Sequence, residues 1–146
     1  MNYLSRVLCI SLILVTSLVT KAQQSKSRPL LFERFSDSLT CSSLEIEKLF
    51  TLPAGSAIEA KLSPSFTLHG IIRASVQKYS NLKTVIIDCS DLGGAILSVS
   101  ARNEEGLTTF VGRILSDKYD DGFELQKDNR GNYLLKKFKV EEVIMD

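Results

Sequence analysis

Residues 66–79 read FTLHGIIRASVQKY, and this stretch decides the fold class. Two rows of residues alternate along it, namely Phe66, Leu68, Gly70, Ile72, Ala74 and Val76 against Thr67, His69, Ile71, Arg73, Ser75 and Gln77. A period of two residues predicts a β-strand with the first row in the core and the second in solvent. Small residues on the inward row, at Gly70 and Ala74, are typical of a strand that bends as its sheet curls. We therefore expect a long, half-buried strand in a barrel or a strongly coiled sheet.

The chain beyond this strand repeats the pattern at a spacing of about ten residues, with short polar turns between apolar segments. Asp120-Asp121-Gly122 and Asp128-Asn129-Arg130-Gly131 have the composition of hairpin turns. The predicted strands are residues 83–89, 94–102, 107–116, 122–127 and 132–137. The tail, residues 138–146, fits a last strand or a short helix, and the pattern leaves both open.

A short helix is expected before the strands, at residues 43–50. Ser42 and Glu45 have the spacing of a capping box, and Pro53 with Gly55 ends the helical pattern. So short a helix is stable only when it packs against something larger. The sequence thus predicts a mainly β fold: an antiparallel up-and-down meander of about six to seven strands, curled or barrel-like, with one short N-terminal helix.

The N-terminus has the features of an export signal, which we place at residues 1–22. A positively charged start precedes an apolar run at residues 7–19, and small residues precede a cleavage point after Ala22. The run is shorter than the roughly 20 residues that cross a bilayer, and no later stretch is longer, so we expect no membrane span after signal removal. The segment resembles bacterial export signals, which implies a secreted or periplasmic protein. A polar, flexible leader at residues 23–29 and a single β-rich domain at residues 30–146 would follow.

Two cysteines, Cys41 and Cys89, remain once the signal is removed. An oxidising compartment favours a disulfide between them. The alternative is two separately buried thiols, because free cysteine packs as a small core residue.

The charge is close to balance, with 18 basic and 17 acidic residues in the whole chain. This balance argues against a strongly electrostatic partner, so we expect no nucleic-acid binding. Lys136, Lys137 and Lys139 flank Phe138, which resembles in miniature a surface for single-stranded nucleic acid. Lysines on a last strand also protect an exposed sheet edge from pairing with other chains, and we favour that role.

The clearest cluster of acidic residues consists of Asp117, Asp120, Asp121 and Glu124. Calcium prefers oxygen ligands from such loops, whereas Asp-Asp-Gly also suits a hairpin turn for backbone reasons. We favour the turn and predict no metal site. The chain contains no nucleophile elbow, phosphate loop or dinucleotide fingerprint, so we predict neither catalytic residues nor a cofactor, and a protein that is not an enzyme.

The outward row Thr67, His69, Ile71 and Arg73 is the candidate partner surface. Ile71 and Ile96 are apolar on predicted outer faces, which indicates a modest hydrophobic patch for a protein or envelope component. The alternative is that the helix covers this second face.

Several segments share the rhythm of known exported proteins: Gly70-Ile71-Ile72, Thr84-Val85-Ile86-Ile87, Gly94-Ala95-Ile96-Leu97, Phe110-Val111-Gly112-Arg113-Ile114 and Gly131-Asn132-Tyr133-Leu134. This pattern resembles small exported bacterial β-rich proteins without a defined activity and, more distantly, the β-rich propeptides of secreted metalloproteases. The resemblance implies a binding or accessory module, or alternatively a protease regulator acting as an inhibitor or a propeptide. A third reading is a small barrel that binds an apolar ligand in space left by Gly70, Ala74 and Gly112.

Overall fold

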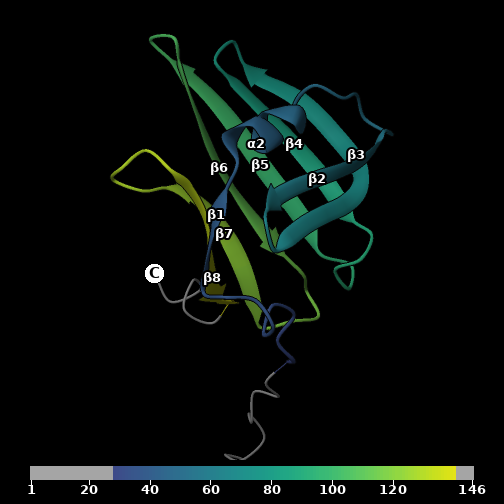
Figure 1. Ribbon diagram of the computed structural model, residues 1–146. Helices are drawn as coiled ribbons and strands as arrows, with labels where there is room; N and C mark the ends of the chain where they lie inside the picture. Colours follow the sequence, from purple (N-terminus) through teal and green to yellow (C-terminus); the bar gives the residue numbers. More distant parts are fainter. Residues whose placement is uncertain (1–27, 141–146) are drawn as a thin grey trace, which may run out of the picture.

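Figure 1 shows the computed structural model, which describes residues 28–140. In this part of the chain eight antiparallel strands form one sheet in the order β1-β8-β7-β6-β5-β4-β3-β2. The strands are β1 (Ser38–Cys41), β2 (Ala57–Ser63), β3 (Phe66–Tyr79), β4 (Leu82–Cys89), β5 (Ile96–Glu104), β6 (Leu107–Leu115), β7 (Asp121–Lys127) and β8 (Tyr133–Lys139). One described helix, α2 (Ser43–Lys48), joins β1 to β2. The predicted mainly β, up-and-down architecture is confirmed, with eight strands instead of six or seven.

The sheet curls until its two end strands meet, which gives a nearly closed barrel. The backbone N–H of Ser42, just after β1, donates to the carbonyl of Leu62 in β2 at 3.0 Å. β1 and β2 are the strands that the expected count lacks. The predicted signal at residues 1–22, most of the leader and the tail beyond residue 140 lie outside the described residues.

Strand β3 keeps its predicted alternation only as far as Ile72. The register with β4 shifts between Ile72 and Ala74, which marks a β-bulge. Beyond the bulge Ser75 lies opposite the buried Val85, whereas Val76 faces outward with 52% of its surface exposed. The prediction that Ala74 and Val76 point inward was therefore wrong, because one extra residue reverses every later side chain.

The barrel interior is filled by apolar side chains from all eight strands, the helix and the N-terminal segment. Phe32, Phe66 and Phe123 are fully buried and form the centre of an aromatic cluster at one end. The inward glycines allow strands to approach closely: a Cβ on Gly112 would lie 2.7 Å from the carbonyl oxygen of Ser98, and one on Gly70 would overlap the carbonyl of Asp88. These two glycines therefore leave no room for a ligand at their positions.

Helix α2 fills the side of the barrel where β1 and β2 meet. The hydroxyl of Ser42 accepts a hydrogen bond from the N–H of Glu45, as the capping box predicts, and the helix ends at Lys48, two residues earlier than expected. Ile46 and Leu49 are each 1% exposed and belong to the core. The helix does not cover the outer face of β3, because Ile71 there is 51% exposed.

Cys41 and Cys89 are free, buried thiols, so the expected disulfide is absent from the structure. Cys41 lies on β1 opposite Tyr133, and Cys89 lies on β4 opposite Gly70. Other strands separate β1 from β4 in both directions around the sheet, which keeps the two thiols apart. Burial raises the pKa of each thiol to about 11.

Candidate binding surface

The predicted partner residues all lie on the outer row of β3, as expected. The Nδ1 atom of His69 is 3.1 Å from the Oδ2 atom of Asp91, and the Nε of Arg73 donates to the Oδ2 of Asp88 at 2.9 Å. Thr67 is half-buried. His69 and Arg73 thus already have partners within the domain, and Ile71 is the exposed apolar member of the row.

Ile71 belongs to a row that continues around the barrel. It lies opposite Asp88 on β4, Asp88 lies opposite Ile96 on β5, and Ile96 lies opposite Leu115 on β6. We call Ile71, Ile96 and Leu115 the outer stripe. Sequence reasoning identified Ile71 and Ile96 but not Leu115, because the strand pairing that brings them together is not local.

A groove of about 970 Å³ lies over the outer faces of β5, β6 and β7 and includes part of the outer stripe. Its outward-pointing lining residues are Ile96, Ser98, Ser100, Val111, Arg113, Leu115, Glu124 and Gln126. These side chains alternate with the buried residues of the same strands, because successive residues of a strand point to opposite faces of the sheet. The outward residues of three neighbouring strands therefore line the groove together. It combines aliphatic groups with hydroxyl and amide groups.

One ion pair crosses the groove, and the exposed Asp117 also lines it. The Nη2 and Nε atoms of Arg113 on β6 donate to the Oε1 atom of Glu124 on β7 at 2.8 and 3.0 Å. The guanidinium of Arg113 also lies 5.8 Å from the ring centre of Phe138. Ser100 contributes a hydroxyl that shares a 2.9 Å hydrogen bond with Thr84. The groove therefore suits a ligand that combines apolar and hydrogen-bonding groups.

The acidic cluster bonds to the chain's own N-terminal segment. Asp121 is 1% exposed and accepts hydrogen bonds from the N–H groups of Leu31 and Phe32 at 2.6 and 2.9 Å. Asp120 accepts from the Nε of Arg28 at 2.8 Å. Sequence reasoning missed this role, because the bonded residues are about 90 positions apart.

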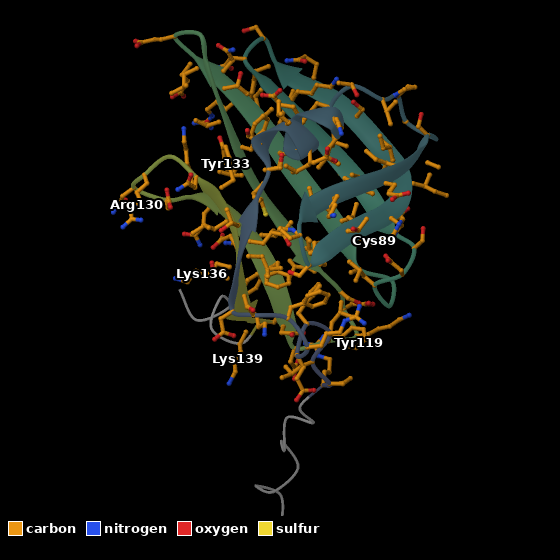
Figure 2. The ribbon with its side chains drawn as sticks, viewed as in Figure 1. Cys89, Tyr119, Arg130, Tyr133, Lys136 and Lys139 are labelled. Atoms are coloured by element: carbon orange, nitrogen blue, oxygen red, sulfur yellow. The ribbon has the colours of Figure 1, made fainter. Side chains whose placement is uncertain are left out.

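The lysines of β8 do not protect a sheet edge, and that expectation was wrong. β8 pairs with β7 on one side and with β1 on the other, so the last strand lies inside the sheet. Lys136, which Figure 2 labels, is exposed on the outer face, whereas the ammonium of Lys137 donates to the carbonyl of Phe35 at 2.7 Å.

Comparison with known proteins gives no match to a family, a curated protein or a solved structure. Within residues 28–140 no three metal-binding side chains are grouped to hold an ion, and no helix is long and apolar enough to cross a membrane. The fold and the surface define a small barrel-like β-domain with an outer-face groove.

Proposed function

We propose that this domain is an exported, non-enzymatic module that binds a protein partner, with the groove over β5, β6 and β7 as the contact surface. The groove itself is the observation that supports the proposal. It places aliphatic, hydroxyl and amide groups on three adjacent strands. The outer stripe continues toward Ile71 on β3, with the ion-paired Asp88 on β4 between Ile96 and Ile71.

A protein segment fits this surface better than a small molecule does. Small-molecule sites are usually concave pockets that enclose most of the ligand. This groove runs along the outside of the sheet and is lined by surface side chains. Aliphatic side chains interspersed with paired charges, here Arg113 with Glu124 and Arg73 with Asp88, also occur in protein interfaces.

The chemistry of the described residues supports a binding role over a catalytic one. The two thiols are buried and their raised pKa keeps them protonated near neutral pH, so they are poor nucleophiles. The single histidine of the sequence lies beside Asp91 and Glu59 on the surface, and within residues 28–140 no hydrogen bond joins its ring to a hydroxyl or a thiol. Export is proposed on the N-terminal sequence alone.

A groove-filling variant tests this function. Ser98 is exposed on β5 inside the groove, and Ser98→Trp would fill it with a side chain that strands accept well. Ser38→Trp is the matched control, because Ser38 is exposed on the outer face of β1, outside the groove. The purified wild-type chain would be used to capture partners from the cell envelope and culture fluid, and the affinity of a captured partner would then be measured by calorimetry.

We expect Ser98→Trp to weaken binding about tenfold or more, by steric exclusion from the groove, while Ser38→Trp binds as the wild type does. Ile71→Lys would report whether the partner extends along the outer stripe to β3. A partner whose affinity is the same for wild type and Ser98→Trp would show that the groove is not the contact surface. A hydrolytic or transfer activity in the purified protein would refute the non-enzymatic assignment.

A further inference from the structure

Strand β6 has one edge that is only partly paired with a neighbouring strand. It pairs with β5 along its whole length, from Ile96↔Leu115 to Glu104↔Leu107. Its pairing with β7 covers only Gly112 to Ile114. Figure 1 shows the result: the hairpin formed by β5 and β6 and the hairpin formed by β7 and β8 diverge, so residues 107–111 of β6 lack a neighbouring strand on one side.

The backbone groups on this edge can be assigned from the turn that precedes it. Glu104 and Leu107 close a two-residue turn, which directs the backbone N–H and C=O of Leu107 toward β5 and those of Thr108 and Phe110 away from it. The Phe110 N–H donates to the hydroxyl of Tyr133, at 3.1 Å, where a neighbouring strand would supply a carbonyl. Figure 2 labels Tyr133 at this position between the hairpins.

The side chains along the same edge are unusually apolar for a surface. Leu107 and Val111 are 60% and 59% exposed, and they point to the same outer face with Thr109 between them. Exposed, extended and apolar edges favour pairing with another strand.

We infer that this edge pairs with the same edge of a second copy of the chain, in an antiparallel dimer whose twofold axis passes beside Thr109. This register places Thr108 opposite Phe110 of the second copy, so the Thr108 N–H donates to the Phe110 carbonyl in both directions. The Thr108 carbonyl takes the place of the Tyr133 hydroxyl as the acceptor for the Phe110 N–H. It also places Leu107 beside Val111 of the second copy, which covers both exposed side chains and, because Val111 lines the groove, covers that end of the groove as well. A twofold interface requires a surface that is complementary to itself, and this edge meets that requirement.

The charges at the two ends of the edge are complementary in this arrangement. Glu104 and Glu105 lie at the tip of the hairpin; Glu104 is 3.5 Å from the Nη1 atom of Arg102, and no ion pair within the described residues involves Glu105. The antiparallel register brings that tip beside Val111 of the second copy, where β6 and β7 separate and β7 ends at Lys127. The ammonium of Lys127 lies 5.7 Å from the ring centre of Tyr133, and among the described residues no carboxylate lies within ion-pair distance of Lys127 or of Arg130 in the adjacent turn. Both cations can therefore form an ion pair with the tip.

A proline substitution tests the backbone pairing. Thr108→Pro removes the edge N–H without removing a backbone hydrogen bond to β5. Thr108→Ala is the matched control: it keeps the N–H and, like the proline variant, loses the 3.3 Å bond from Nδ2 of Asn103 to the Thr108 hydroxyl. Analytical ultracentrifugation over a wide concentration range would measure the dimer dissociation constant. We expect Thr108→Pro to raise it about tenfold or more, because two hydrogen bonds are lost for each dimer, and Thr108→Ala to leave it nearly unchanged.

Charge reversal at exposed residues gives an independent test. Glu104→Lys with Glu105→Lys in one chain, and Lys127→Glu with Arg130→Glu in another, should each give monomers, because like charges then meet across the interface. Mixing the two chains restores complementary charges on both sides and should give a heterodimer. A wild-type protein that stays monomeric at every concentration overturns the inference, as does a dimer that is indifferent to Thr108→Pro or to both charge reversals.

Discussion

The carboxylate of Asp121 shows how much a single buried side chain can determine. Its two oxygens accept the N–H groups of Leu31 and Phe32, and those bonds fix Phe32 in the aromatic cluster at the end of the barrel. We expect Asp121→Asn to lower the free energy of unfolding by about 2 kcal/mol, because an amide supplies only one acceptor and presents N–H groups to a donor. Urea unfolding would measure the change. Asp117→Asn, on an exposed side chain of the preceding loop, should stay within about 0.5 kcal/mol of the wild type, and equal losses in both variants would contradict the assigned role.

The buried thiols predict a loss of stability at alkaline pH. Burial raises the pKa of Cys89 to about 11 from an ordinary value of 9.0, so the neutral thiol is favoured in the folded state. This contribution is fully present below pH 9.0 and disappears as the pH rises to about 11, because the unfolded chain loses its proton first. The stability difference between wild type and Cys89→Ala should therefore shift by about 2 kcal/mol against the wild type over this interval, as measured by urea unfolding at several pH values. A difference that does not change with pH would show that the thiol is not desolvated.

Among the elements, the turn between β5 and β6 is built with an unfavourable residue. Glu105 has a φ of 53° and Gly106 a φ of 84°, the left-handed conformation that two-residue hairpin turns require. Asparagine adopts this conformation more easily than glutamate does. We expect Glu105→Asn to raise the free energy of unfolding by roughly 0.5–1 kcal/mol. The control is Glu104→Asn, one residue earlier in the strand, which should not stabilise; thermal unfolding at low protein concentration would compare the two.

The elements could be predicted from the sequence wherever their pattern is local. Strand β5 has its buried Leu97 and Val99 where alternation places them, and the capping box of α2 forms as its spacing predicts. The direction of the side chains of β3 beyond Ile72 could not be predicted, because pairing with β4 determines the bulge at Arg73. β1 is four residues long, too short for a period to be recognised, although the alternation of β2 was present in the sequence.

At the scale of the whole molecule, the surface depends on contacts that no local pattern encodes. The outward orientation of Ile71 and Ile96 was predictable, but the groove needs Arg113 and Glu124 to meet across β6 and β7. The disulfide was predicted from the number of cysteines and the expected compartment, whereas the order of the strands decides whether two cysteines meet. The position of β1 beside β8 in the sheet also decides which strands have free edges.

Closure of the barrel depends on helix α2, and this gives a prediction for the whole fold. β1 is bonded to β8 over only four residues, and the Ser42 to Leu62 hydrogen bond joins it to β2. Ile46, which is 1% exposed, fills the space at that junction, so Ile46→Ala should lower the free energy of unfolding by about 2–5 kcal/mol.

The same variant should change the pattern of hydrogen exchange. Amides of β1, α2 and β2 would exchange through a shared local opening, while those of β4 and β5, which are paired on both sides, would exchange only on global unfolding. Leu44→Ala is the matched control, because Leu44 lies on the same helix with 68% of its surface exposed. If Ile46→Ala raised exchange equally in every strand, the barrel would open as one cooperative unit, and the helix would not be the element that holds the two end strands together.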